Sequence, residues 1–188
     1  MKNIIIGGVV RSGKTTLANL LREEFSYSKC ESDAIISAFQ NAFPSLNINH
    51  KDKVLSRKNY EPFLFALLDG FSKDLKYTKN VTIFPGAQFL PENLSRYKNI
   101  DNYIVIFLGL DGITPEGLVE SFKTFDTVND WTFKKDDKWL YEHCKNTIEE
   151  SNKLKKDCEK FGFYYFNTFH NRQQTFDEIK DLIKKEQV

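Results

Sequence analysis

The stretch Gly8-Val-Val-Arg-Ser-Gly-Lys-Thr15 decides the fold of this 188-residue chain. It matches the pattern GxxxxGK followed by Ser or Thr at every fixed position, which a random chain of this length would do with a likelihood of roughly one per cent or less. The apolar run Ile4-Ile-Ile6 precedes it, and a helical pattern over Thr15–Phe25 follows. In that setting, backbone N–H groups of the loop converge on phosphate oxygens at the positive end of a helix. The stretch therefore predicts a nucleotide-binding loop.

Two side chains of this loop carry specific chemistry. Lys14 can reach the β- and γ-phosphates, and the hydroxyl of Thr15 is a ligand for Mg²⁺. The implied cofactors are therefore ATP and Mg²⁺. We expect the nucleotide contacts to come from the loop and the first turn of its helix: Gly8, Arg11, Ser12, Gly13, Lys14, Thr15 and Thr16.

Composition and charge narrow the class of protein. Hydrophobic residues make up 40% and charged residues 28% of the chain, as is ordinary for a globular domain. The net charge is +1, without the basic excess typical of nucleic-acid-binding proteins, so we expect no nucleic-acid partner. No apolar run approaches the roughly 20 residues that cross a bilayer, so we expect no membrane partner. Three cysteines without a clustered spacing favour a cytoplasmic location.

Strand and helix patterns alternate on both sides of the loop. This alternation predicts a parallel sheet covered by helices on both faces, in a single α/β domain over residues 1–188. The further strand patterns lie near Glu31-Ser32 and at Val81–Phe84, Tyr103–Leu108 and Phe163–Phe166. The further helical patterns cover 34–43, 54–75, 114–123 and 137–161, and Thr175-Phe-Asp-Glu178 predicts a capping box that opens a last helix.

This layout resembles the small P-loop kinases, the group that includes the adenylate, shikimate and gluconate kinases. The resemblance covers nearly the whole chain, although the loop at 8–15 is its only specific motif. It implies the P-loop NTPase fold, a three-layer α/β/α arrangement with a five-stranded parallel sheet in the order 2-3-1-4-5. It also implies a short lid at about residues 122–136 and the transfer of the ATP γ-phosphate to a small-molecule acceptor.

The same resemblance assigns candidate acceptor-binding residues. Asp33 would orient or deprotonate the acceptor hydroxyl, or hold Mg²⁺ through water, although an Asp at that point is also a good helix N-cap. Glu31 is a weaker candidate on the same strand face. Arg57 would bind a substrate anion, unless it is a surface arginine. Gly86 would lie in a loop that faces the acceptor.

The nucleotide side of the site has candidates of its own. Arg172, after the last strand, would stack on the adenine. Related kinases use lid arginines to neutralise the charge that develops during transfer. Residues 122–136 contain no arginine, so Lys123 is the candidate, and Arg11 could compensate from beneath. Trp131 and Trp139 would line a pocket near the lid or simply pack.

The third strand departs from the kinase pattern. Kinases of this group commonly end it with an acidic residue that binds metal-coordinated water, whereas this chain has Ile83-Phe-Pro-Gly86. Metal binding would then rest on Thr15 with Asp33 or Glu31. Asp111, after the fourth strand, is a weaker candidate. The string that ends at Asp69 imitates a metal-binding strand but lies in a helical pattern.

Several functions remain open from the sequence. The first is a kinase that acts on a hydroxyl group, and a carboxylate at position 33 favours it. A nucleoside or nucleoside monophosphate acceptor is also compatible, and so is a degenerate ATP-binding protein. A regulatory GTPase is disfavoured because no guanine-reading NKxD segment follows a strand. The acceptor and the oligomeric state are not predicted.

Overall fold

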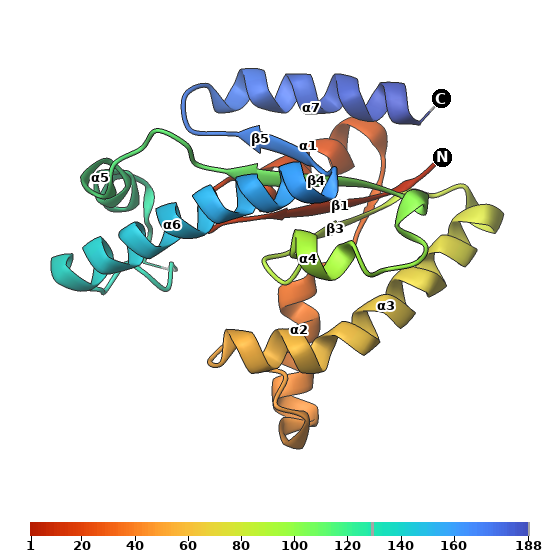
Figure 1. Cartoon of the computed structure of the whole chain (residues 1–188), viewed down its shortest axis with the longest axis horizontal. Helices are drawn as coiled ribbons and strands as arrows, with labels where there is room; N and C mark the ends of the chain where they lie inside the picture. Colours follow the sequence, from red (N-terminus) through yellow and green to blue (C-terminus); the bar gives the residue numbers. More distant parts are fainter. Residues whose placement is uncertain (129, 188) are drawn as a thin grey trace.

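The computed structural model describes residues 1–128 and 130–187, and within these the chain forms a five-stranded parallel sheet between two layers of helices (Figure 1). The strand order is β2-β3-β1-β4-β5, and all four strand pairs are parallel. This confirms the predicted fold class and strand order. The strands are β1 (Asn3–Gly8), β2 (Ser28–Lys29), β3 (Thr82–Pro85), β4 (Tyr103–Gly109) and β5 (Tyr164–Asn167).

The helices divide between the two faces of the sheet. On one face α1 and α7 pack against Ile4 and Ile6, and on the other α2, α3 and α6 pack on the side of Ile5. The Ile run of β1 is fully buried because this central strand is covered on both faces. The helices are α1 (Lys14–Phe25), α2 (Ser32–Ala42), α3 (Lys53–Thr78), α4 (Pro91–Leu94), α5 (Pro115–Phe125), α6 (Asp137–Phe161) and α7 (Arg172–Glu186), with 3₁₀ turns at Pro44–Leu46 and Ile100–Asn102.

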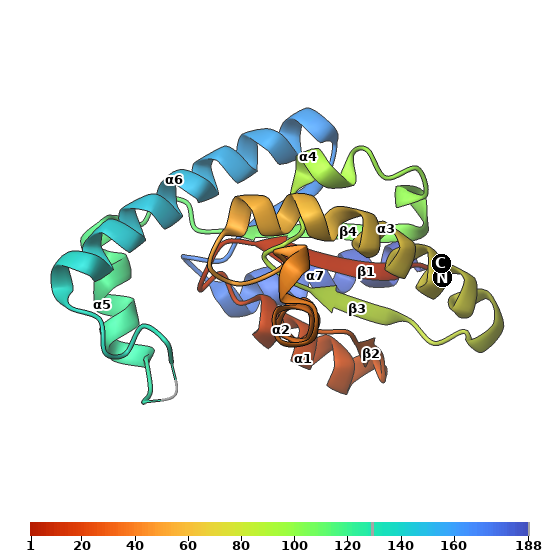
Figure 2. The ribbon, with the colours of Figure 1, turned by 90° about the horizontal axis from the view of Figure 1, so that it is seen from below.

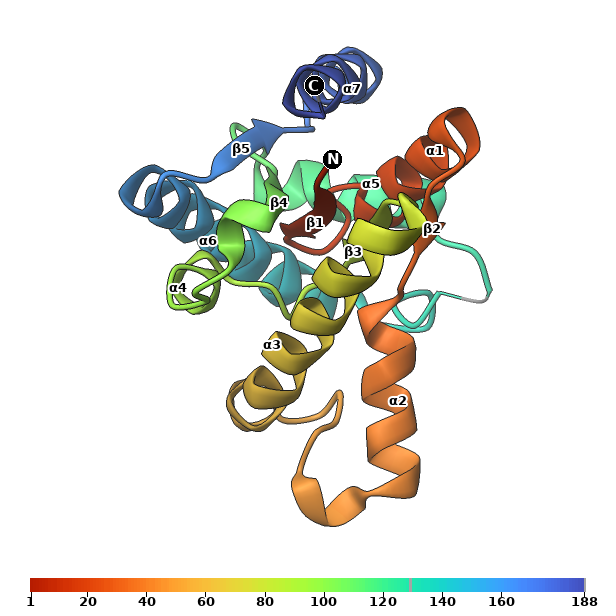
Figure 3. The same cartoon turned by 90° about the vertical axis from the view of Figure 1, so that its right-hand side faces the viewer.

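Two parts of the fold project from this body. Helices α2 and α3 extend from the sheet on one side and are joined at their far end (Figure 3). They pack together through an edge-on contact of Phe39 with Phe63, at 4.8 Å between ring centroids. In a different direction, α5 and the first half of α6 extend beyond the sheet (Figure 2). The predicted lid at 122–136 falls on the end of α5 and the loop that connects it to α6, except that Asn129 lies outside the described residues.

The predicted capping box at Thr175–Glu178 is wrong. Helix α7 begins four residues earlier, at Arg172, and its N-cap is Asn171 instead of Thr175. Asn171 accepts a hydrogen bond from the Gln174 backbone N–H at 3.2 Å. Asn is as good an N-cap as Thr, so the earlier cap ends the loop first. The Thr175 hydroxyl instead donates to the Asn171 carbonyl at 2.9 Å, from inside the first turn.

The second strand is shorter and earlier than predicted. It ends at Lys29, and Ser32 is already helical. Among the described residues, no helix has the length and apolar character needed to cross a membrane.

Candidate functional site

The glycine-rich loop lies at the carboxyl end of β1, where its backbone requires glycine at two positions. Gly8 has φ 140° and Gly13 has φ 90°. A Cβ at Gly8 would lie 2.3 Å from the Leu108 carbonyl oxygen of the neighbouring strand. Gly13 is the N-cap of α1, so the loop turns directly into the helix. The predicted strand–loop–helix unit is therefore present, with the positive end of α1 facing the loop.

Buried hydroxyls fix the shape of this loop. The Ser12 hydroxyl donates to the Val9 carbonyl at 2.8 Å, across the turn. Thr168, after β5, donates from its own buried hydroxyl to the Ser12 carbonyl at 2.9 Å. No sequence pattern pointed to Thr168, because its role depends on the end of β5 lying beside the loop.

Lys14 folds back across the loop. Its ammonium group donates to the Val9 carbonyl at 2.6 Å. Desolvation lowers the pKa of Lys14 to about 8, and the opposing charge of Asp33 limits this shift. The Asp33 carboxylate therefore lies within electrostatic reach of the loop. Thr15 and Thr16, by contrast, are exposed at the start of α1.

Arg11 joins the loop to the lid. It has φ 62°, a left-handed conformation that is uncommon for a residue with a side chain. Its guanidinium forms ion pairs with Asp126 and, at 3.5 Å, with Asp130, and lies 5.0 Å above the centroid of the Phe122 ring. Arg11 was expected beneath the lid, but its neutralisation by lid carboxylates was not predicted.

Arg172 lies against the same loop from the start of α7. It donates to the Arg11 carbonyl at 2.9 Å, and its side chain approaches the Cα side of Gly13. Desolvation and the nearby charge of Arg11 lower its pKa. The structure thus brings together the two arginines that were predicted on the nucleotide side.

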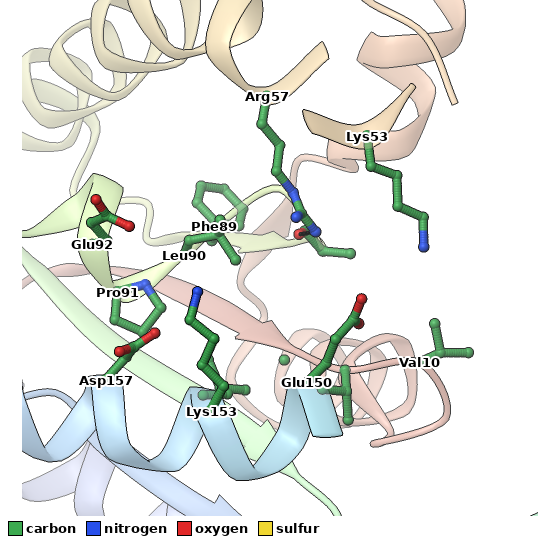
Figure 4. A pocket seen from close by; sticks show the side chains of 14 residues that line it. Val10, Lys53, Arg57, Phe89, Leu90, Pro91, Glu92, Glu150, Lys153 and Asp157 are labelled. Atoms are coloured by element: carbon green, nitrogen blue, oxygen red, sulfur yellow. Dashed lines mark hydrogen bonds between the residues drawn. The ribbon is translucent and has the colours of Figure 1, made fainter. Parts of the chain in front are cut away.

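A pocket of about 220 Å³ opens beside the loop. Residues 8–10 of the loop form one end, Lys53 and Arg57 reach in from α3, and Glu150 and Lys153 reach in from α6 (Figure 4). The segment after β3 completes the lining with Ala87, Phe89, Leu90, Pro91 and Glu92, and α6 adds Leu154 and Asp157.

Arg57 is the predicted acceptor-binding residue that lines this pocket. Its Nη2 donates to the Ala87 carbonyl at 3.1 Å, whereas its buried Nε has no hydrogen-bond partner in the described part of the chain. Desolvation lowers the pKa of Arg57, and the negative charge of Glu150 opposes this. A half-buried guanidinium with an unused donor is suited to an anionic or polar ligand group.

Asp33 lies in the first turn of α2 and is exposed. It is not the N-cap, a position that Glu31 occupies without a side-chain hydrogen bond. Its only close partner in the described residues is Gln88, whose amide donates to it at 3.4 Å. Glu31 instead pairs with Lys29 at 2.6 Å. Of these two carboxylates, Asp33 is the one available to a ligand.

Gly86 lies behind the pocket, at the end of β3, where the chain packs closely against α2. It is buried, its N–H donates to the Ile6 carbonyl at 3.0 Å, and a Cβ there would lie 2.7 Å from the Ser32 hydroxyl. The next residue, Ala87, is the one that lines the pocket. Gly86 thus permits the close approach of β3 to α2.

The remaining candidates have structural partners. In the lid region, Lys123 pairs with Asp137 at 2.6 Å, and Trp131 packs edge-on against Trp139 at 5.6 Å. Asp111 accepts from Tyr165 at 2.6 Å and pairs with Lys155 at 3.0 Å.

The prediction that the string ending at Asp69 is helical is confirmed. Asp69 lies on α3, where it accepts from the Tyr97 hydroxyl at 2.7 Å. It therefore belongs to the packing of α3 and has no place beside the phosphate loop.

Five charged residues of the pocket were not predicted from the sequence: Lys53, Glu150, Lys153 and Asp157 on α3 and α6, and Glu92 after β3. Charged residues on amphipathic helices are mostly solvated, so nothing in the pattern distinguished these from their neighbours. Their position depends on how α3 and α6 cross the sheet, which the periodicity of one helix does not determine.

No cluster of three or more acidic, histidine or cysteine residues in the described chain could hold a metal ion unaided. The residues present nevertheless fit Mg²⁺ bound with a nucleotide, because Mg²⁺ keeps several waters and takes phosphate oxygens with one or two protein ligands. The exposed hydroxyl of Thr15 could supply a direct ligand. Asp33, whose charge reaches the loop, could act through water.

No family model and no curated protein match this sequence. Solved structures do match. They include a shikimate kinase from Bacteroides thetaiotaomicron (15% identity, TM-score 0.58, 97% of this chain and 98% of that one). A gluconokinase from Sinorhizobium meliloti matches with 14% identity and a TM-score of 0.54, over 94% of this chain and 88% of that one. A shikimate kinase from Acinetobacter baumannii, solved with shikimate, matches with 14% identity and a TM-score of 0.52, over 100% and 96%. The chain therefore has the fold of the small P-loop kinases.

Proposed function

We propose that this protein is an ATP-dependent kinase that transfers the γ-phosphate to a hydroxyl group of a small molecule. One observation carries the proposal: the phosphate-binding loop forms one end of a pocket of about 220 Å³, so that an acceptor in the pocket lies next to the transferred phosphate. In such transfer, positioning and electrostatic stabilisation supply most of the catalysis. The fold shared with shikimate kinase and gluconokinase supports a small acceptor.

We assign each predicted site residue a role in the proposed reaction. Lys14 leaves the Val9 carbonyl and binds the β- and γ-phosphates. Thr15 holds Mg²⁺, which would neutralise phosphate charge when bound. Asp33, exposed and charged, orients the acceptor hydroxyl and takes its proton. Lys123 of the lid would add positive charge, and Arg172 beside the loop would stack on the adenine. Gly86 permits the close packing of β3 and α2 behind the pocket.

A monophosphate acceptor is the second form of this function. It would need no base, and Arg57 with Lys53 would bind its phosphate. Glu150 disfavours it, because a second anion would meet this carboxylate within the same pocket.

A catalytically degenerate ATP-binding protein is the alternative class. The pairing of Arg11 with Asp126 supports it, since a lid carboxylate here neutralises an arginine that could have replaced the missing lid arginines. The third strand also ends without a carboxylate. Against it, the loop keeps Lys14 and Thr15.

The test is Mg²⁺-dependent ADP formation from ATP with a panel of acceptors, with Lys14→Ala as the blank. We expect one class of hydroxyl compound to accelerate ADP formation, and Asp33→Asn to abolish most of that acceleration while ATP binding persists. As the matched control, Asp101→Asn changes an acid in the distant 3₁₀ turn and should leave the rate unchanged. If only monophosphates accelerate ADP formation, and Asp33→Asn does not change that acceleration, the acceptor is a monophosphate and not a hydroxyl compound.

A further inference from the structure

The two helices that form the walls of the pocket bring opposite charges into it. Arg57 and Lys53 enter from α3, and Glu150 enters from α6 with its carboxylate directed toward the space below them (Figure 4). The carboxylate and the guanidinium therefore face one cavity from opposite sides. A ligand that fills this cavity would contact both.

Glu150 has no partner of its own in the described part of the chain. Neither an ion pair nor a hydrogen bond engages its carboxylate there. Its negative charge nonetheless opposes the lowering of the pKa of both Lys14 and Arg57. It thus lies within electrostatic reach of the phosphate loop and of the predicted acceptor-binding arginine. Opposite it, the buried Nε of Arg57 also lacks a partner among the described residues.

The charges around the pocket balance one another. Three cations, Lys53, Arg57 and Lys153, line it together with three acids, Glu92, Glu150 and Asp157. Glu150 would repel a ligand with only negative groups, and the cations of α3 would repel a ligand with only positive groups. A ligand with one group of each sign places a favourable charge against each wall. Such charge complementarity contributes more to specificity than to affinity.

We propose that the acceptor is a hydroxyl compound that carries both a protonated amine and a carboxylate, with the amine on Glu150 and the carboxylate on Arg57. This inference rests on the proposed kinase function and names its substrate class. The acceptor hydroxyl oxygen forms a bond to the γ-phosphorus, the bond from that phosphorus to the β–γ bridging oxygen breaks, and ADP leaves. The hydroxyl proton passes to Asp33.

The test compares acceptors that differ by a single group. Glucosaminate against gluconate, and serine against glycerate, each exchange an amine for a hydroxyl at the same carbon. Phosphorylation is measured as kcat and KM, and binding of the same compounds is measured by calorimetry with ADP present. Glu150→Gln removes the charge at nearly constant shape, and Glu149→Gln is the matched control on the adjacent, exposed residue.

We expect the wild type to prefer an amine-bearing member at least tenfold over its partner. Glu150→Gln should raise KM and Kd for that member roughly tenfold to a hundredfold, the range for a hydrogen bond to a charged group, with kcat little changed. Glu149→Gln should change neither value. Equal use of both members, or a preference that survives Glu150→Gln, would overturn the inference while leaving the kinase function intact.

The binding measurement separates the two proposals. If no compound is phosphorylated but the amine-bearing member binds and loses affinity in Glu150→Gln, the kinase function fails and the ligand class stands. If neither member of either pair binds or reacts, the ligand class is refuted. ADP formation with other acceptors would still test the kinase function.

Discussion

The lowered pKa of Lys14 predicts that ATP affinity falls as the pH rises above 8. In the free protein, desolvation lowers the pKa of Lys14 to about 8, whereas contact with a triphosphate favours the charged form and raises it again. Below pH 8 the lysine is already charged, and above pH 8 binding must take up a proton. The dissociation constant therefore grows by about eightfold between pH 7.5 and pH 9, by the linkage relation for one group.

The assay is calorimetric titration with Mg-ATP across this range, in two buffers that differ in ionisation enthalpy. The difference in heat counts the protons taken up, which should approach one at pH 9. Lys14→Arg keeps its charge throughout and should give an affinity independent of pH. A flat wild-type profile, or the same slope in Lys14→Arg, would refute the assignment.

Three further predictions concern the loop, the lid and the pocket. Gly8→Ala should destabilise the protein by at least about 2 kcal/mol in urea unfolding, because the new Cβ meets a backbone carbonyl at a strained φ. Gly70→Ala, on α3 with open space around it, should instead stabilise by about 0.5–1 kcal/mol, and equal effects would contradict this account. Asp126→Asn should weaken the attachment of the lid to Arg11 by about 1–3 kcal/mol and increase acrylamide quenching of the two tryptophans, both in or beside the lid. Asp181→Asn, on α7, should leave quenching unchanged, and similar quenching in both variants would argue against the Arg11 attachment. Arg57→Lys should raise KM for the acceptor roughly tenfold without lowering ATP affinity, since lysine lacks the planar fork; an unchanged KM would remove Arg57 from the acceptor site.

The main elements of the fold could be predicted because their signals are local. The Ile4–Ile6 run has the continuous apolar pattern of a strand covered on both faces, and the loop that follows it has a fixed spacing. The range predicted for the long helix, 137–161, agrees with α6. The predicted start of α7 was wrong because two residues suited to capping, Asn171 and Thr175, lie close together in the sequence, and the earlier one, Asn171, caps the helix.

The candidate site divides in the same way. The loop residues could be predicted as candidates because they form a motif, and Arg57 because of the resemblance to the kinases. Glu150 could not be found, because it is one of many acids on an amphipathic helix and becomes special only where α6 passes the pocket. The ion pair of Arg11 with Asp126 likewise depends on how the segment between α5 and α6 packs against the phosphate loop.

The central claim is that the loop and the pocket beside it carry out phosphoryl transfer, and its most direct test follows the phosphate itself. ATP labelled in the γ-phosphate is incubated with the protein, Mg²⁺ and the acceptor panel, and the products are separated. We predict label in a phosphate ester of one acceptor, lost in Lys14→Ala and strongly reduced in Asp33→Asn. Tight ATP binding with label found only in ATP, whichever acceptor is present, would contradict the claim and favour the degenerate ATP-binding protein.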